Sequence, residues 1–390
     1  MRTILITGPG GSGRTTVAAA TALKAARDGT RTLVLSADRT DTLGAALGVR
    51  TGPAPAEAGD HLTTWRPDAT ERFRADLTAF QDRATTALDL LGANRLDAEE
   101  VTPLPGAEEL ALLRALRDAA TSDTYDLLVV DLPPAPQALA LLSLPEELRR
   151  YLRRLLPAER QAARALRPVL GRLAGVPMPA EWLYETAARW DLELAAVEAV
   201  VEDRATTVRL VAEPGPAGAD AVRAAGTALA LRGLRVDALV ANRVLPGATN
   251  DTWLAALAAQ QRKGLDEWQE TYDVHEVPHL GHDPRGTHDL AALPVPGVVN
   301  EMPSPVEWPL EDRLADEGVL VWHIPLAGAI RDELDLIRRG DELVVTAGQF
   351  RRIVPLPSAL RRCTVDGAAL REGELRIRFA PDPGLWPRTR

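Results

Sequence analysis

RTILITGPGGSGRTTVAAATALKAAR, residues 2–27, decides the fold. It opens with a short run of leucine and β-branched residues, which predicts a buried strand, and its alanine-rich end predicts a helix. Glycines in the turn between them let backbone N–H groups wrap around phosphate oxygens, and the N-terminus of a following helix favours their negative charge. The segment therefore predicts a nucleotide-binding loop made of Gly8, Gly10, Gly11, Ser12, Gly13, Arg14, Thr15 and Thr16.

The loop departs from the usual phosphate-loop sequence at a position that faces the ligand. Its spacing is that of G-x-x-x-x-G-K-[ST], with Arg14 in place of the lysine and with Thr15 as a hydroxyl that can ligate Mg²⁺. A wide planar guanidinium is not interchangeable with a compact ammonium, so we expect weakened nucleotide binding. The alternative is a glycine-rich turn inherited from a nucleotide-binding ancestor.

Short apolar runs and helical stretches alternate along most of the chain. Strands are expected at Thr3–Thr7, Thr32–Ser36, Asp126–Asp131, Val208–Ala212 and Val236–Ala241. Such alternation predicts a doubly wound, mainly parallel α/β sheet with helices on both faces. We place this P-loop NTPase domain in residues 1–305, with helical insertions at about 63–120 and 145–205.

The pattern changes near the C-terminus. Prolines accumulate in residues 293–308, which we interpret as a linker between domains. Beyond it, short alternating runs such as VLVWHIP and ELRIRF are separated by glycine and proline. We therefore expect a small antiparallel β-sandwich in residues 316–390, folding separately and dispensable for nucleotide binding.

Composition excludes several classes of protein. The net charge of −10 argues against nonspecific binding of nucleic acid. Cys363 is the one cysteine, which excludes an intrachain disulfide and a cysteine-pair zinc site. We see no signal peptide and no apolar run long enough to span a bilayer, and we expect a cytoplasmic protein with at most peripheral membrane contact.

Four ordered blocks and the C-terminal tail resemble the ArsA-type ATPases, the family of the arsenite-pump and tail-anchored-protein-targeting ATPases. The loop is similar to the family's GKGGVGKTT, VLSADRTDTLGAALG resembles its switch I, and DLLVVDLPPAPQALALLSLPE its switch II. VANRVLP matches a further segment, and residues 340–379 resemble the small-heat-shock-protein-like domain of one bacterial branch. The resemblance implies ATP or ADP with Mg²⁺ as cofactors.

The resemblance also implies roles for particular residues. Asp38 falls on the water-orienting or general-base aspartate, Asp131 on the acidic residue associated with Mg²⁺, and Asn242 on an adenine contact. Thr15 would ligate the metal, and Arg14 would stand at the catalytic lysine. Both aspartates lie where nucleotides bind in open α/β sheets. The alternative for each is a helix cap or a solvated loop.

The departures from the family are concentrated in two segments. Pro9 replaces the lysine that, by resemblance, reaches across a dimer to the partner's nucleotide. In switch II, five positions differ from the family's residues, and the added prolines should stiffen the segment: Leu132, Pro133, Ala135, Pro136 and Gln137. The chain has few lysines, which offers a neutral explanation for Arg14 but not for Pro9.

Two charged clusters have competing interpretations. The histidines 275, 279, 282 and 288 with Asp283 match no zinc spacing, so we favour a polar surface loop over a metal site. Leu148, Tyr151, Leu152, Leu155 and Leu156 share one helical face, expected to pack on a core rather than to bind a client or a membrane. The arginines 149, 150, 153 and 154 lie opposite and are expected to be solvated, with an anionic membrane or an acidic partner as the alternative.

The sequence favours a slow ATP-hydrolysing switch, a homodimer or a heterodimer with a paralogue, whose nucleotide state controls binding of a hydrophobic protein client. Pro9 and the rewritten switch II favour the alternative, a non-hydrolysing scaffold that pairs with an intact paralogue. A chaperone-like binding protein is a third possibility, implied by the C-terminal resemblance alone.

Overall fold

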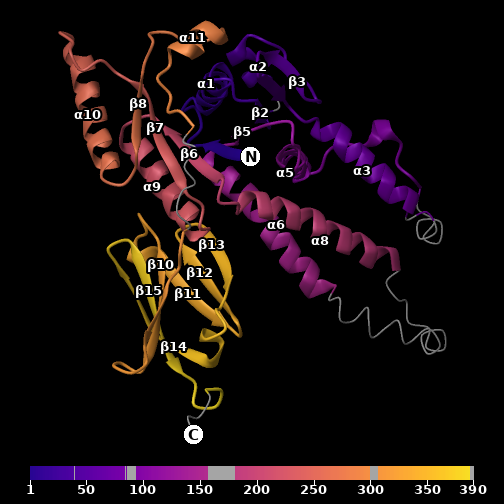
Figure 1. Cartoon of the computed structure of the whole chain (residues 1–390), viewed down its shortest axis with the longest axis vertical. Helices are drawn as coiled ribbons and strands as arrows, with labels where there is room; N and C mark the ends of the chain where they lie inside the picture. The colour runs from indigo at the N-terminus through magenta and orange to yellow at the C-terminus, as the bar shows by residue number, and fades with distance from the viewer. Residues whose placement is uncertain (39, 84, 86–93, 157–180, 299–305, 387–390) are drawn as a thin grey trace.

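A large α/β body lies above a smaller β domain (Figure 1). The computed structural model describes the chain except residues 39, 84, 86–93, 157–180, 299–305 and 387–390. The large body is built on an eight-stranded sheet in the order β3-β4-β2-β5-β1-β6-β7-β8. In the part of the chain that is described, no helix is long and apolar enough to cross a membrane.

The strands of the large sheet confirm the doubly wound architecture. Six of them pair in parallel with their neighbours: β1 (Arg2–Thr7), β2 (Thr32–Ser36), β5 (Leu127–Asp131), β6 (Thr206–Ala212), β7 (Val236–Val244) and β8 (Val274–Pro278). Every residue of β2, β5 and β6 is buried. Continuous apolar strands of this kind require helices on both faces, because neither face tolerates water.

Helices cover the two faces of the sheet in separate groups. One apolar core holds α1 (Arg14–Arg27), α2 (Thr42–Leu47) and α11 (Gly286–Ala292). The core of the opposite face holds α5 (Ala107–Ala120), α6 (Ala135–Leu155), α8 (Glu181–Val201), α9 (Pro216–Leu231) and α10 (Thr252–Gln269). Helices α1, α2 and α11 contact one another and lie together at the top of the large body in Figure 1.

The first expected helical insertion is wrong at its start. Residues Leu62–Trp65 form β4, which pairs in parallel with β2 and makes an antiparallel hairpin with β3 (Ala56–Gly59). The hairpin turns at His61, whose φ is 56°. Helix α3 (Ala69–Arg83), the short η1 (Ala98–Glu100) and α5 follow, as the sequence predicts.

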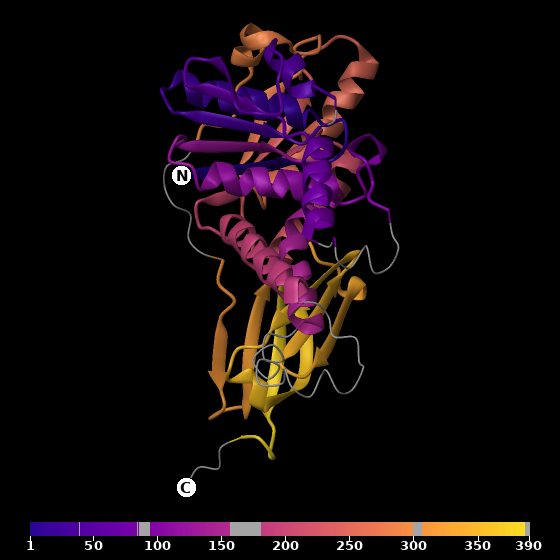
Figure 2. The ribbon, with the colours of Figure 1, turned by 90° about the vertical axis from the view of Figure 1, so that its right-hand side faces the viewer.

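The second insertion is a pair of helices, α6 and α8, that lie side by side in both views (Figures 1 and 2). α6 begins ten residues earlier than expected, and residues 157–180 of the insertion lie outside the described residues. We expected the apolar stripe to pack on a core. That expectation is wrong at the end of α6, because Tyr151 is 53% exposed and Leu155 is 77% exposed.

The arginines of α6 have acidic partners within the chain. The expected solvated face is wrong for Arg149 and Arg150, which are largely buried, whereas Arg153 and Arg154 are exposed. Arg149 lies 3.1 Å from Asp191 of α8 and also pairs with Glu198. Arg153 pairs with Asp191, and both Arg150 and Arg154 pair with Glu342 of the β domain. These contacts hold α6 against α8 on one side and against the β domain on the other.

The C-terminal residues form the expected sandwich of two antiparallel sheets. One sheet has the order β14-β15-β10-β9, and the other β11-β12-β13. Its strands are β9 (Leu310–Arg313), β10 (Val319–Pro325), β11 (Leu334–Arg339), β12 (Glu342–Ala347), β13 (Phe350–Pro355), β14 (Cys363–Arg371) and β15 (Glu374–Pro381), with short 3-10 turns η2 (Arg331–Glu333) and η3 (Leu360–Arg362). Alternate residues of β10, β12 and β15 fill the space between the sheets. Strands β9 and β11 were not expected from the sequence.

The β domain packs directly on the large body (Figure 2). Leu231 at the end of α9 is 1% exposed and belongs to the apolar core of the β domain. Arg352 donates to the Leu231 carbonyl at 3.1 Å, and Thr227 donates to the Ala327 carbonyl at 3.0 Å. Phe350 contacts the core of the large body. These contacts argue against the expected independence of the domain.

Leu231→Ala tests this interface. We expect the free energy of unfolding to fall by about 2–4 kcal/mol, because the substitution leaves a cavity between α9 and the β domain. Urea unfolding of the full chain measures it, with Leu192→Ala as the control, since Leu192 is 71% exposed on α8. Equal, small effects of both substitutions would show that the two bodies are joined only by the linker.

Candidate functional site

The glycine-rich loop joins β1 to α1 and is fitted closely against two neighbouring strands. A Cβ on Gly8 would lie 1.9 Å from the Val211 carbonyl oxygen of β6, and one on Gly13 would lie 2.2 Å from Nδ2 of Asn242. Gly13 also has a φ of 88°, which L side chains rarely adopt. The glycines are therefore required by the approach of the loop to β6 and β7.

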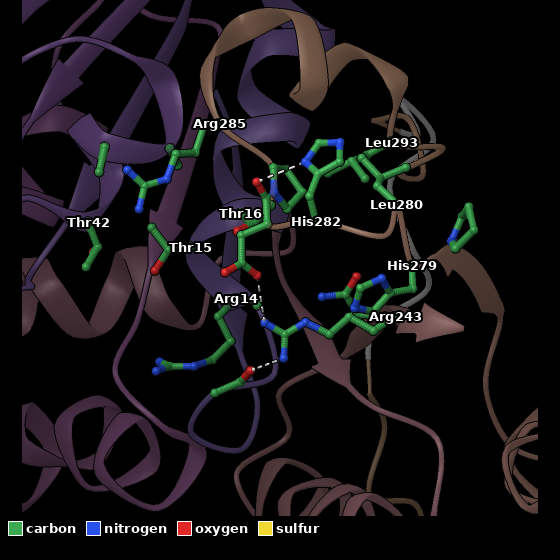
Figure 3. Close-up of a pocket in the computed structure, with 18 residues that line it drawn as sticks. Arg14, Thr15, Thr16, Thr42, Arg243, His279, Leu280, His282, Arg285 and Leu293 are labelled. Carbon is green, nitrogen blue, oxygen red and sulfur yellow. Dashed lines mark hydrogen bonds and ion pairs between the residues drawn. The ribbon is translucent and has the colours of Figure 1, made fainter. Parts of the chain in front are cut away.

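The first turn of α1 presents its backbone to the cavity beside the loop (Figure 3). No side chain caps the helix at Gly13, so the backbone N–H groups of its first turn have no capping side-chain acceptor. Gly11, Gly13, Arg14, Thr15 and Thr16 all line this cavity. Uncapped donors and the positive end of the helix dipole make the position favourable for an anion.

Asp131 ends β5 and is buried beside Thr15, which lines the cavity, and 4% of its surface is exposed. Its Oδ2 accepts hydrogen bonds from Thr15 Oγ1 at 2.9 Å and from Ser36 Oγ at 3.0 Å. Its Oδ1 is buried and has no hydrogen-bond partner in the described part of the chain. Burial raises the pKa of Asp131 to about 6, against the hydrogen bonds from Thr15 and Ser36 that lower it.

This half-satisfied carboxylate is suited to a divalent cation. Mg²⁺ prefers oxygen ligands and keeps several of its waters, so it is held by one or two carboxylates or hydroxyls together with phosphate oxygens. The Thr15 hydroxyl and the free Oδ1 of Asp131 are such groups, and they lie beside the loop that would hold the phosphates. The residues predicted for Mg²⁺ are thus brought together.

Arg14, which stands where the phosphate-loop pattern has lysine, contacts the segment after β5. Its guanidinium donates to the carbonyl oxygen of Leu132, the residue that follows β5. Burial lowers the pKa of Arg14, although the carboxylates of Asp131 and Asp38 raise it. The arginine therefore ties the loop to switch II through one of its five N–H donors, and it still lines the cavity.

Asp38 lies on the exposed turn between β2 and α2. Its carboxylate accepts from the Thr40 backbone N–H at 3.1 Å and hydroxyl at 3.0 Å, and from Thr42 Oγ1 at 2.8 Å. These bonds fix the carboxylate within switch I and leave it exposed to solvent. Its predicted catalytic role stays a prediction.

Asn242 of β7 supports the loop. Its side chain is buried, and Nδ2 donates to the Ser12 carbonyl oxygen at 2.8 Å. One N–H of the amide is engaged by the loop, so the second N–H and Oδ1 are left for another partner. The predicted contact with adenine stays a prediction, and the position of Asn242 on the cavity wall is compatible with it.

A cavity of about 350 Å³ separates the loop from the segment after β8. Its far wall is formed by Pro278, His279, Leu280, His282, Asp283, Pro284 and Arg285. His279, His282 and His288 are exposed, as expected, but the surface-loop interpretation is wrong for His275, which lies in β8, and for His288, which lies in α11. That interpretation also did not anticipate that His279 and His282 line the cavity. Among the described residues no cluster could hold a metal through His, Cys, Asp or Glu side chains alone.

Arg243 was also missed, and it closes the rim of the cavity. Its φ of 56° places a non-glycine residue in the left-handed region. Its guanidinium donates to the Gly11 carbonyl at 3.1 Å and to Glu213 at 2.5 Å. Figure 3 shows the bond to Gly11 and the ion pair of Arg243 with Asp283. Ligands bind near the carboxyl ends of parallel strands, and this rule could have found both features, since Arg243 lies at the carboxyl end of β7 and the segment follows β8.

Comparisons with known proteins agree with this geometry. A family model described as an anion-transporting ATPase, ArsA, matches residues 1–294, and one for an HSP20-like domain found in ArsA matches residues 317–379. The chain is 75% identical to an uncharacterised protein of Streptomyces coelicolor, over 100% of both chains. It is 32% identical to a protein of Mycobacterium tuberculosis, over 99% of this chain and 97% of the relative. A putative arsenical pump-driving ATPase of Aquifex aeolicus is 27% identical, over 97% of this chain and 99% of the relative.

Asp131→Asn tests the buried carboxylate. The pKa of Asp131 is about 6 in the folded chain, against an ordinary value of 3.8. The folded chain therefore holds this proton more tightly, and wild-type stability falls as pH rises from about 4 to about 6. We expect Asp131→Asn to raise the free energy of unfolding by on the order of 1–3 kcal/mol at pH 7.5 and by little at pH 4.5.

Urea unfolding without divalent cations measures the effect, with the exposed Asp60→Asn as the control. Added Mg²⁺ with ADP should stabilise the wild type and fail to stabilise Asp131→Asn. A variant that is less stable than the wild type at pH 7.5 would contradict an uncompensated buried charge.

Proposed function

The chain belongs to the ArsA family of anion-transporting ATPases, and from that premise we propose that it is a switch that binds ATP with Mg²⁺ and hydrolyses it slowly. The observation that supports this most directly is the free Oδ1 of Asp131 beside the Thr15 hydroxyl. A buried carboxylate that lacks a partner costs stability. A metal and a phosphate chain would offset that cost.

Each part of the cavity has a role in this proposal. The backbone N–H groups of the loop and of α1 hold the phosphates, and the wall of residues 278–285 with Asn242 faces the nucleoside. Thr15 and Asp131 hold Mg²⁺, which when bound neutralises charge on the phosphates. Asp38 orients the attacking water, and its bonds to Thr40 and Thr42 fix the carboxylate for that task.

Two substitutions make the reaction slow. Phosphoryl transfer depends on positioned cations, because negative charge is redistributed over the phosphate oxygens in the transition state. Arg14 donates to the Leu132 carbonyl instead of reaching a phosphate, and Pro9 has no charge to offer to a partner's site. The loop thus lacks both of the ammonium groups that the family supplies.

Nucleotide state is coupled to the helical insertions through α6. The Ala135 N–H at the start of α6 donates to the Gly8 carbonyl at 2.9 Å, so the helix begins on the loop itself. Its far end presents the exposed Tyr151 and Leu155, and α8 presents Leu192. We propose that a hydrophobic protein client binds there and that the switch is a dimer, with itself or with a paralogue.

A non-hydrolysing scaffold is the second candidate, and one observation favours it. Leu132 is bonded by Arg14 and is followed by Pro133, Pro134 and Pro136, so the segment after β5 is both tied and stiffened. A switch II that cannot move would leave a protein that binds nucleotide without turnover. A chaperone-like role of the β domain rests on the family resemblance.

Calorimetry with ATP, with and without Mg²⁺, tests the proposal. We expect Mg²⁺-dependent binding, and we expect Arg14→Lys to tighten it by about tenfold, because an ammonium reaches the phosphates that the guanidinium does not. Lys263→Arg on the exposed face of α10 controls for lysine content. If no heat of binding is seen at about 1 mM nucleotide, the binding free energy is weaker than roughly −4 kcal/mol, and the scaffold replaces the switch.

Turnover distinguishes the two candidates. We expect wild-type hydrolysis well below about 1 s⁻¹. Asp38→Asn should lower it by about 10- to 100-fold, because the water loses its acceptor. The double change Pro9→Lys with Arg14→Lys should raise the rate severalfold in a phosphate-release assay, with the exposed Asp28→Asn as the control. Tighter binding without any gain in rate would support the scaffold.

A further inference from the structure

Three arginines line the cavity, and two of them are already engaged. Arg14 donates to the Leu132 carbonyl, and Arg243 donates to the Gly11 carbonyl and to Glu213. The guanidinium of Arg285 has no acidic or carbonyl partner within the described part of the chain. An exposed cation without a partner, on the wall of a cavity built for an anion, is available to a ligand.

The backbone fixes Arg285 at this position. Its N–H donates to Asp289 Oδ2 at 3.0 Å, and Gly286, at a φ of 73°, starts α11 directly after it. The Cα of Gly286 is 3.5 Å from where a Cβ on Gly48 would lie, so the start of α11 lies against the end of α2. The residue therefore stands over α2 on a packed support, not on a free loop.

The side chain reaches from this support into the cavity. Figure 3 shows the guanidinium of Arg285 directed toward Thr15 and Thr42, across the cavity from the loop. Thr15 is the proposed metal ligand and Thr42 belongs to the start of α2 beside switch I. The cation is thus aimed at the phosphate end of the cavity, and the histidines of the same segment stand farther along the wall, beside Arg243 and Leu293 (Figure 3).

We infer that Arg285 binds the phosphate chain of the nucleotide and supplies the positive charge that the loop has lost. A guanidinium forms paired, charge-assisted hydrogen bonds with phosphate oxygens, and it is the cation best suited to reach them from the side. This inference rests on the proposed function, since it names a contact to the same nucleotide. The segment after β8 then contacts the phosphate chain as well as the nucleoside.

Competition binding measures the contact with a fluorescent ADP analogue as the reporter. The competitors are MgATP and inorganic tripolyphosphate, which shares only the phosphate chain with ATP. We expect Arg285→Gln to weaken both competitors by about 10- to 100-fold. Arg285→Lys should recover part of the loss, because it keeps the charge without the fork.

Arg262→Gln is the matched control, since Arg262 is an exposed arginine on α10 that pairs with Glu276 away from the cavity. It should change both affinities by less than about twofold, in line with the small effect of surface charges. Arg285 is exposed, so Arg285→Gln without ligand should have the same melting temperature as the wild type. Arg285→Ala is a second variant that lacks the charge, and we expect it to behave in the same way.

The outcomes separate this inference from the proposed function. Wild-type binding with unchanged affinities in Arg285→Gln overturns the phosphate contact and leaves the nucleotide site standing. A loss for MgATP without a loss for tripolyphosphate also overturns it, because Arg285 would then contact the nucleoside. If the wild type binds neither competitor nor the reporter, the proposed function fails and this contact fails with it.

Discussion

The buried carboxylate of Asp131 is the constraint on which the site depends. It stands at the carboxyl end of a central strand, and through one oxygen it holds Thr15 of α1 and Ser36 of β2 in fixed positions. Three elements that are distant in the sequence are joined there. The other oxygen has no partner among the described residues, and burial raises the pKa of the group to about 6. A fold that only needed stability would place an apolar residue here, and proteins accept such costs at functional sites.

A continuous series of contacts leads from the loop to the β domain. The carbonyl of Gly8 accepts from Ala135 at the start of α6, and α6 contacts β12 through the pairs of Arg150 and Arg154 with Glu342. Arg352 of β13 reaches back to Glu146 of the same helix at 3.4 Å. Individually, ion pairs that are partly exposed contribute little. Together with apolar contacts they place the β domain on α6, the helix that begins at the glycine-rich loop. A movement of switch II would therefore change the contacts between α6 and the β domain.

The site has the oxygen groups that suit a metal, but its cations differ from those that the family's phosphate loop supplies. Thr15 and Asp131, the oxygen ligands that we propose for a metal, lie in contact, and the glycine framework is held by β6 and β7. The cations have been rearranged: Arg14 is bonded to switch II and Pro9 offers no charge. Metal and phosphate binding depend on groups that are present, whereas rapid phosphoryl transfer depends on cations in the right place. The two functions therefore need not be lost together.

The sequence by itself determined the parallel sheet, the glycine-rich loop between β1 and α1, the position of Asp131 at a strand end and the C-terminal sandwich. Each of these follows from a local pattern of apolar residues and glycines, which fixes strands, turns and helices over a few residues. The β3–β4 hairpin was missed because its residues carry almost no apolar alternation. Only the tertiary structure decided that Asn242 holds the loop, that Glu342 receives the arginines of α6, and that Arg285 faces the phosphate end of the cavity. These contacts join residues separated by tens to hundreds of positions, and their partners are chosen by the packing of whole elements, which no local pattern records.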